Sequence, residues 1–292
     1  MPELPEMQGL VERLDALYRG ATFEGLQLLQ FNALKTVAPS PDDLVGRTVI
    51  GAERRAKYAI VDLDGPRLVF HLSQGGRVDI EDPPKTTRPK PGVARLHFSD
   101  RGHDDDHLDS GGERPSMLIK EFGTERRAGV WLLEATDPGP LVGLGPEPDS
   151  DEFADLLLTV DDNRRIHTVL RDQRTVAGIG RGHADDALHR AGISPFASLA
   201  KLDDTQRHHL VASVRGVLAE ALEHERHRTG GLPTKLGDRF IVHRRHGQQC
   251  PAAGCDDTLR RVSFESHEIV YCPSCQTGGK VLADRRLSRL LK

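Results

Sequence analysis

The chain of 292 residues has few aromatic side chains and no long apolar run. Phe, Trp and Tyr make up 4% of the residues, with a single Trp, whereas hydrophobic residues make up 37%. No stretch approaches the ~20 consecutive apolar residues of a membrane-spanning helix. The N-terminus also lacks the basic and then apolar segments of a secretory signal. These absences predict a soluble cytoplasmic protein with no membrane partner, and the length favours two domains.

Cysteine is scarce, and all four cysteines lie between positions 250 and 275. A disulfide framework would spread its cysteines along the chain. Here two close pairs, Cys250-x4-Cys255 and Cys272-x2-Cys275, flank a segment of 16 residues. This spacing predicts that four thiolates surround one Zn²⁺ ion. Because four protein ligands leave no open position, the predicted zinc is structural.

The excess of acidic charge is small and unevenly distributed. The formal net charge of −4 argues weakly against a polyanionic partner. From Arg239 onward, however, 10 basic residues stand against 5 acidic ones. Arg260 and Arg261 fall between the cysteine pairs, and Arg285, Arg286 and Arg289 follow them. A basic patch of this kind can bind phosphate on an acidic protein, so the C-terminal end predicts a nucleic-acid contact.

The first 135 residues have the pattern of a helix followed by many short strands. Leu10, Val11, Leu14 and Leu17 recur at helical spacing, which predicts a helix over residues 2–18. Short apolar runs between turn residues then predict antiparallel strands. These runs cover residues 25–29, 48–51, 58–63, 67–72, 94–98, 117–121 and 129–133. One helix ahead of such strands predicts an antiparallel β-sandwich as the N-terminal domain, residues 1–135.

A linker rich in Pro and Gly, residues 136–150, separates this domain from a helical one. Residues 151–238 then form the predicted helical domain, and residues 239–292 the predicted zinc finger with its β-hairpin. The predicted helices are residues 151–158, 165–173, 183–191 and 203–228. The fold class expected from the sequence is therefore α+β.

Two local features each allow two interpretations, and a third has one. The Gly-rich turn at residues 178–182 is either a packing corner between helices or a phosphate site completed by Arg181 and His183. The His/Asp cluster within residues 99–116 could bind a metal, but a solvated, mobile hairpin tip is favoured. Lys57, taken alone, is expected to be a solvated lysine at a strand end.

The first six residues carry the candidate chemistry. A small second residue, Pro2, favours removal of Met1, which would leave a secondary amine at the terminus. An α-amine titrates near ~8, well below lysine at ~10.4, so much of it would be unprotonated at neutral pH. Glu3 and Glu6 lie within one turn, and an amine beside acids suits Schiff-base chemistry. The alternative is a plain helix start, which also favours Pro and acids.

Together these stretches resemble the formamidopyrimidine-DNA glycosylase / endonuclease VIII family over nearly the whole chain. The N-terminal signature, the lysine strand, the Arg-Arg turn, the linker, the helix–two-turn–helix and the end of the zinc finger all have counterparts. The matching stretches are residues 2–6, 54–58, 126–129, 144–148, 172–188 and 271–276. All six occur in the family's order.

The resemblance implies a bifunctional DNA glycosylase and AP lyase of base excision repair. Pro2 would attack C1′ of a damaged nucleotide flipped out of the helix. Glu3 would move protons, Glu6 would support the site, and Lys57 would hold the adjacent phosphate. A Schiff base and β,δ-elimination would follow. The implied DNA-binding residues are His71, Gln74, Arg127, Arg181, His183, Arg260 and Arg261, and the implied partner of this nucleoid-associated monomer is damaged DNA.

Some positions depart from the family pattern. Arg181 replaces an Asn that grips phosphate, Ala128 replaces a Phe wedge, and Gln74 stands where purine-specific members have Met. Ser266 and His267 occupy the positions of the usual finger Arg.

The segment between Gly231 and Val242 is short where members specific for oxidised guanine carry a loop that covers the purine. This predicts a preference for oxidised pyrimidines over 8-oxoguanine or formamidopyrimidine. The missing wedge predicts a preference for single-stranded or bubble DNA, because stacking on an aromatic side chain is worth ~1–3 kcal/mol per base.

Two other classes of function are kept as alternatives. Arg181 and the missing finger Arg favour a catalytically weak paralogue that binds damaged or abasic DNA. A zinc-finger transcription factor is disfavoured, because one finger without a recognition helix does not read sequence.

Overall fold

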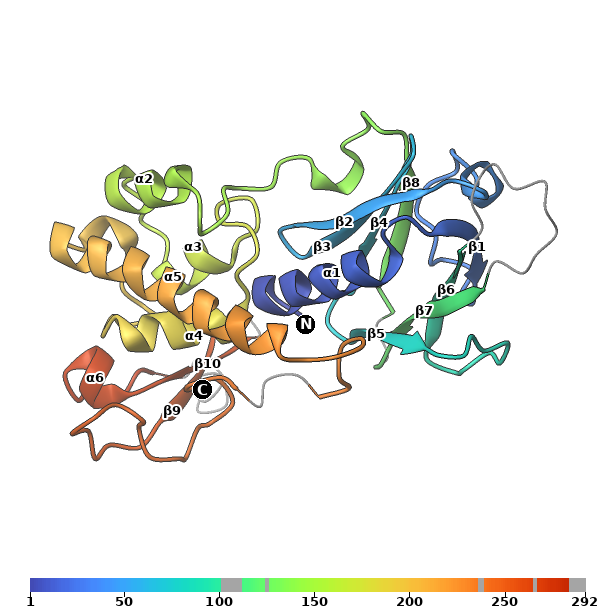
Figure 1. Ribbon diagram of the computed structural model, residues 1–292. Coiled ribbons are helices and arrows are strands. Elements are labelled where there is room, and N and C mark those ends of the chain that lie inside the picture. Colours follow the sequence, from blue (N-terminus) through green and yellow to red (C-terminus); the bar gives the residue numbers. More distant parts are fainter. Residues whose placement is uncertain (101–111, 124–125, 236–238, 265–266, 284–292) are drawn as a thin grey trace, which may run out of the picture. The chain divides into compact units, whose positions relative to one another are not determined.

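The computed structural model describes residues 1–100, 112–123, 126–235, 239–264 and 267–283 (Figure 1). The chain divides into two compact units. The first comprises Met1–Gly143 and Leu222–Leu236, and the second comprises Leu144–Ala221 and Gly237–Lys292. The domain boundaries expected from the sequence stay a prediction. None of the described helices is long and apolar enough to cross a membrane.

The first unit begins with helix α1, Leu4–Tyr18. Its N-cap is Glu3, and Glu3 and Glu6 bond reciprocally in a capping box, which satisfies two backbone N–H groups that the helix cannot pair itself. Leu10 and Leu14 are 0% and 1% exposed, as their helical spacing predicts. The chain leaves the helix through Gly20, whose φ of 77° favours glycine.

Two antiparallel sheets of four strands each follow among the described residues of this unit. One has the order β1-β6-β7-β5, with β1 (Thr22–Leu28), β6 (Gly92–Ser99), β7 (Glu113–Glu121) and β5 (Gly76–Glu81). The other has the order β2-β3-β4-β8, with β2 (Val49–Arg55), β3 (Tyr58–Leu63), β4 (Arg67–His71) and β8 (Gly129–Leu133). Two 3-10 turns, η1 (Pro41–Leu44) and η2 (Gly139–Leu141), complete the unit.

A single apolar cluster joins α1 to both sheets. Tyr18 of α1 stacks on Phe98 of β6 with ring centroids 4.0 Å apart, and Phe23 of β1 meets Phe98 edge-on. Phe70 of β4 is fully buried in the same cluster. Alternating strand residues thus fill one core, and the predicted antiparallel sandwich with a leading helix is confirmed.

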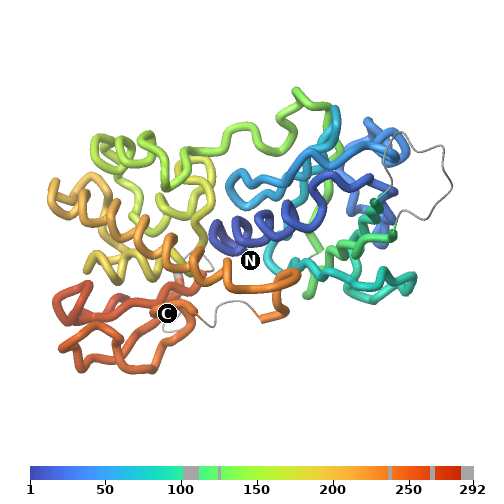
Figure 2. The backbone as a smooth tube through the Cα atoms, in the orientation of Figure 1, coloured from blue at the N-terminus to red at the C-terminus, as the bar shows by residue number. Residues whose placement is uncertain are grey.

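Strand β5 is an edge strand that the sequence reading did not predict. The backbone after α5 runs beside it, as the orange segment next to the teal strand shows in Figure 2. Leu232 N–H donates to Val78 O at 2.7 Å. The buried Arg77 donates from Nε to Pro233 O at 2.7 Å and to Thr234 O at 3.2 Å. The bond from Leu232 satisfies the Val78 carbonyl, a backbone group that an edge strand would otherwise expose.

The second unit contains the remaining helices and the finger. Its elements are α2 (Asp151–Thr159), α3 (Ile166–Arg171), α4 (Arg181–Arg190), η3 (Leu199–Lys201), most of α5 (Asp204–Arg226), β9 (Arg260–Phe264), β10 (His267–Tyr271) and α6 (Pro273–Thr277). The last residues of α5, from Leu222, are counted with the first unit.

Two adjacent acids on α4 hold the finger to this helix. Asp186 accepts hydrogen bonds from the backbone N–H groups of Ile241, Val242 and His243 at 2.7, 2.9 and 3.1 Å. Asp185 accepts from Val270 N–H at 3.1 Å and from His243 Nδ1 at 2.6 Å. Buried carboxylates with several donors each stabilise such a joint. The predicted α+β class, with helices and a β-hairpin after the sandwich, is confirmed.

Candidate active site and metal centre

The N-terminal acids are buried at the start of α1. Glu3 and Glu6 are only 5% and 7% exposed, and Pro2 is buried as well. Glu3 N–H donates to Glu6 Oε2 at 2.8 Å, so Glu6 fixes the backbone that carries Glu3. The backbone at the start of α1 is therefore that of an ordinary helix start, the alternative interpretation. This geometry does not exclude a catalytic role for Glu3 and Glu6, because partial removal from water strengthens the interactions of these acids with a charged neighbour.

Lys57 lies in the two-residue turn between β2 and β3. Arg55 pairs with Tyr58 across the turn, and Ala56 has a φ of 55°, a left-handed backbone uncommon for alanine. Arg54 Nη1 donates to Ala56 O at 3.0 Å and holds this shape. Lys57 is 3% exposed, so the expected solvated lysine at a strand end is wrong. Burial of a charged ammonium group costs free energy, and charged groups in such surroundings are common at functional sites. Lys57 is therefore a candidate functional residue.

His71 ends β4 and lies opposite Tyr58 of β3. Burial, and next the charge of Lys57, lower the pKa of His71 to about 4, so the imidazole is neutral at neutral pH. Ser73 N–H donates to His71 Nδ1 at 3.3 Å, which assigns the ring proton to Nε2. Tyr58 packs against His71 at 4.7 Å and edge-on against Trp131 of β8 at 5.9 Å. His71 thus offers one neutral N–H donor near Lys57.

The loop after β4 presents Gln74 to solvent. The next residue, Gly75, accepts a hydrogen bond from Phe122 N–H at 3.0 Å, and a Cβ on Gly75 would lie 1.9 Å from Phe122 O. Only glycine fits this close approach, which makes Gln74 the exposed tip of a tightly held loop.

The Arg-Arg turn follows β7. Glu121 Oε2 accepts from Ala128 N–H at 2.7 Å and closes the turn, in which Arg127 is exposed. Ala128 stands where the family has a Phe, and it is only 4% exposed. Its methyl group therefore does not project from the surface as a Phe ring could. Residues 124 and 125 lie outside the described part of the chain.

In the second unit, the Gly-rich turn runs into α4 with Gly180 as N-cap and Arg181 as first residue. Gln173 braces the turn from inside: its Nε2 donates to Ile179 O at 2.7 Å, and its Oε1 accepts from Gly178 N–H at 2.9 Å. Arg181 is half-buried and belongs to the helix rather than to the turn.

His183 is 3% exposed, and its ring meets Phe240 edge-on at 5.3 Å. The structure thus uses His183 in packing, and its DNA contact stays a prediction. On the finger hairpin Arg260 and Arg261 are exposed, and Arg261 Nη1 lies 3.2 Å from Glu268 Oε2. Such a surface pair is weak and can be exchanged for a phosphate.

Several sequence expectations lie outside the described residues. They concern Ser266 at the position of the finger Arg, the His/Asp cluster at 103–107, and Arg285, Arg286 and Arg289.

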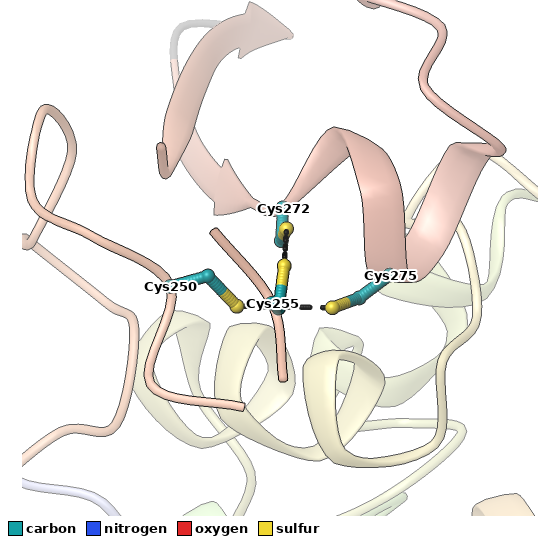
Figure 3. A group of neighbouring side chains, drawn as sticks. All are labelled: Cys250, Cys255, Cys272 and Cys275. Carbon is teal, nitrogen blue, oxygen red and sulfur yellow. Dashed lines mark hydrogen bonds between the residues drawn. The ribbon is translucent and has the colours of Figure 1, made fainter. Parts of the chain in front are cut away.

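The four cysteines converge from two segments (Figure 3). Their Sγ atoms lie within 4.8 Å of one another, with Cys250–Cys275 and Cys255–Cys272 distances of 3.7 Å. A tetrahedral ion with Zn–S bonds of ~2.3 Å requires sulfur–sulfur distances of ~3.8 Å. The cluster therefore fits a metal ion with four thiolate ligands and no open position.

The thiols differ in how readily they ionise. Burial raises the pKa of the Cys250 thiol to about 11, whereas the Asp257 backbone N–H lowers the pKa of Cys255. An ion must displace protons from such thiols, so metal affinity falls with falling pH.

Two arrangements around these sites were missed from the sequence. His189 of α4 has Nε2 3.1 Å from Cys250 Sγ, and Arg77 holds the segment after α5 against β5. For the first arrangement, the available signal was the number of charged and imidazole side chains in α4.

The predicted residues divide between the two units. The first unit carries Pro2, Glu3, Glu6, Lys57, His71, Gln74 and Arg127, and the second carries Arg181, His183, Arg260, Arg261 and the four cysteines. Of these, hydrogen bonds or electrostatic interactions join Glu3 with Glu6, Lys57 with His71, and the cysteines with one another.

A sandwich led by a helix with buried acids, a helical unit with a tight glycine turn and a hairpin with four clustered cysteines have the domain order of DNA glycosylases of the helix–two-turn–helix class. Residues 1–108 match the model of the formamidopyrimidine-DNA glycosylase N-terminal domain, and residues 144–230 match that of the formamidopyrimidine-DNA glycosylase H2TH domain. The chain belongs to the formamidopyrimidine-DNA glycosylase family of base excision repair, whose members are DNA glycosylases with AP lyase activity.

Relatives are similar in sequence, one over nearly the whole of this chain and one over about half of it. The formamidopyrimidine-DNA glycosylase of Caulobacter sp. (strain K31) is 33% identical over 94% of this chain and 100% of its own length. An uncharacterized formamidopyrimidine-DNA glycosylase-like protein of Mycobacterium tuberculosis is 44% identical over 51% of this chain and 94% of its own length.

Solved structures show the same fold. The MutM (Fpg) protein from Thermus thermophilus is 27% identical and has a TM-score of 0.77, with coverage of 96% of this chain and 100% of that chain. The Lactococcus lactis Fpg in complex with DNA containing an abasic site is 22% identical and has a TM-score of 0.76, with coverage of 94% and 99%. The second likeness concerns the fold alone.

Proposed function

We propose that this chain removes oxidised bases from DNA and then cleaves the strand through a Schiff base on Pro2. The observation that carries the proposal is the buried acid pair directly after Pro2, in which Glu6 Oε2 accepts the Glu3 N–H at 2.8 Å. An amine nucleophile needs a proton carrier at a fixed place, and this bond fixes the orientation of the peptide group that joins Pro2 to Glu3.

The proposed reaction begins once Met1 is removed. The Pro2 nitrogen attacks C1′ of the flipped nucleotide, the glycosidic bond breaks, and the base leaves with its electron pair and takes the proton that the Pro2 nitrogen loses. Glu3 protonates the sugar-ring oxygen, the bond from C1′ to this oxygen breaks, and a cationic Schiff base, an iminium without an N–H, forms between Pro2 and C1′. Loss of a C2′ proton then expels the 3′ phosphate, and a second elimination expels the 5′ phosphate. Water finally releases the sugar remnant from Pro2.

Lys57 and His71 are proposed to hold the phosphate beside the lesion. Lys57 supplies a full charge from a site with 3% exposure, where an ionic contact is stronger than in water. The neutral His71 adds the Nε2–H group that its Nδ1 bond to Ser73 N–H leaves available.

The metal is proposed to be one structural zinc ion, held by Cys250, Cys255, Cys272 and Cys275. All four donors are sulfur at tetrahedral distances, which suits zinc and leaves no place for a substrate. Metal analysis of the purified chain should give one zinc per chain, and Cys272→Ser should lose it. The exposed Arg260 and Arg261 are proposed to bring this finger onto the DNA backbone.

Oxidised pyrimidines are the proposed substrates. The segment after α5 is short and is bound along β5 through Leu232 and Arg77, which supports a lesion site without a purine cover. Cleavage of duplexes with 5-hydroxyuracil should be faster than cleavage of those with 8-oxoguanine. Faster cleavage of the 8-oxoguanine duplex would overturn the preference.

Single-stranded or bubble DNA is proposed as the preferred DNA structure around the lesion. Ala128 and Gln74 supply no aromatic surface to fill the space of a flipped base, so excision benefits where unstacking is already complete. Bubble substrates should therefore be cleaved faster than the matched duplex. Equal rates, or a faster duplex, would refute this.

Trapping the Schiff base tests the chemistry. Borohydride should join the chain to DNA containing an abasic site, and peptide mapping should place the adduct on the N-terminal peptide, with Met1 absent by intact mass. Lys57→Arg is the matched control, because it keeps the charge and removes the rival amine of the site. An adduct that survives on a chain that retains Met1 contradicts the role of Pro2.

Arg181 supports one alternative, a damaged-DNA binding protein with weak catalysis. A half-buried Arg at the start of α4 binds phosphate with full charge where the family grips it with an amide. Tight binding to abasic DNA without any trapped adduct would establish this function instead. We also propose a monomer in the cytoplasm, associated with the nucleoid, and size-exclusion with light scattering tests its mass.

A further inference from the structure

A histidine of helix α4 lies against the cysteine cluster. His189 is 7% exposed, Cys250 is 4% exposed, and 3.1 Å separates His189 Nε2 from Cys250 Sγ. The two residues are 61 positions apart in the chain, so the contact results from the folding of the finger onto α4.

The chemistry of the cluster determines which of the two residues donates the hydrogen bond. Four thiolates around a divalent cation leave a net negative charge, and a buried thiolate can only accept hydrogen bonds. Cys250 already accepts from the Ala252 backbone N–H. A neutral imidazole carries one N–H, and only a proton on Nε2 makes the close approach to Cys250 favourable.

We propose that His189 is a positioning residue of the metal centre, whose Nε2–H donates a hydrogen bond to the Cys250 thiolate. The inference rests on the proposed metal and goes beyond it. The proton stays on Nε2, and His189 is not a ligand, because four sulfur atoms already complete the tetrahedron. Partners of this kind orient ligands and tune the metal.

The neighbours of His189 show that this face of α4 makes polar contacts with the finger. Asp185 lies four residues earlier, one turn along the same face, and receives Val270 N–H and His243 Nδ1 from the finger. Asp186 receives three more backbone N–H groups. His189 therefore lies on the same helix that anchors the finger. Its bond to Cys250 would link retention of the metal to the packing of the finger on α4.

Cobalt substitution tests the proposal, because Co²⁺ reports its ligands by absorption. His189→Phe should move the sulfur-to-cobalt charge-transfer band to lower energy, since the thiolate loses a donor, and should leave the d–d bands of a four-sulfur site unchanged. Transfer of zinc to a chelator should become about 10–100-fold more favourable. His189→Gln, which keeps an N–H donor, should lie close to the wild type.

Leu188→Met is the matched control, because Leu188 is the fully buried neighbour of His189 on the same helix and the substitution changes no polar group. Identical charge-transfer bands and zinc transfer in His189→Phe overturn the proposal, and so do altered d–d bands, which would make His189 a ligand. If His189→Phe does not fold, His189→Gln decides: a large loss of zinc there overturns it. A wild-type chain that binds neither zinc nor cobalt overturns the metal centre itself, and this inference with it.

Discussion

Gly182 of α4 lies directly under the ring of Phe240, and a Cβ built on Gly182 would approach the ring Cζ to 2.2 Å. Phe240 is 9% exposed and also packs against His183 and His243. The first turn of α4, where Arg181 is expected to meet phosphate, therefore depends on a position without a side chain.

Gly182→Ala is expected to destabilise the second unit by ~1–3 kcal/mol, because the added methyl must displace a packed ring. Urea denaturation gives the free energy of unfolding. Gly216→Ala is the control: its Cβ meets only Arg190 Nη1 at 2.9 Å, the mobile end of a side chain, and Ala should gain up to ~1 kcal/mol of helix propensity. Equal effects of the two substitutions would contradict the role of the ring.

Arg77→Met is expected to release the segment after α5 from β5. The substitution leaves Pro233 O and Thr234 O without the Nε donor, which should cost ~1–3 kcal/mol locally. The exposed Lys235 follows at once, so trypsin should cleave there faster in the variant. Arg47→Met, which removes an exposed side chain bonded to Asp64 O, should leave this rate unchanged. An unchanged rate in Arg77→Met would show that the segment is held by other contacts.

His71 predicts a stability that depends on pH. Its pKa is about 4 in the folded chain, and histidine titrates near ~6.5 when unfolded, so between these values the unfolded chain binds more protons. Stability is therefore complete above pH ~6.5 and falls by up to ~3 kcal/mol as the pH drops to ~4. His71→Gln should flatten this part of the curve in urea titrations. Parallel curves for both proteins would mean that other groups carry the acid sensitivity.

Removal of the metal is expected to loosen the finger and not the sandwich. Cys272 is fully buried, so Cys272→Ser or a strong chelator should expose the segment around it. Amide hydrogen exchange should rise over residues 249–277 and at the N–H groups bound by Asp186. The strands β2, β3 and β4 should keep their protection. Fast exchange in these strands as well would show that the metal supports the whole chain.

The spacing of apolar residues along the chain was sufficient to predict the helices and strands that have one apolar face. The helical recurrence of Leu10 and Leu14 and the short alternating runs predicted α1 and most of the sandwich strands. The cysteine spacing likewise predicted the cluster, because ligand positions depend on a short hairpin. These features depend on neighbours within about one element.

Features that depend on distant contacts were not accessible in this way. Strand β5 begins at Gly76, the second glycine of a pair typical of a turn, and its partner after α5 comes from about 150 residues further along the chain. Lys57 directly follows a left-handed alanine, a conformation that turn preferences do not favour at Ala56, and its burial was not predicted. The lowered pKa of His71, to which Lys57 contributes, and the contact of His189 with Cys250 arise only when separate segments meet.

Trp131 is the single tryptophan of the chain, and its ring touches Tyr58, which in turn packs on His71. Intrinsic fluorescence excited at the red edge of protein absorption therefore arises from one known place in the sandwich, two aromatic contacts from the predicted phosphate site. A stopped-flow record of this emission can follow the arrival of DNA at Lys57 and His71 in real time, with no dye attached and no residue changed.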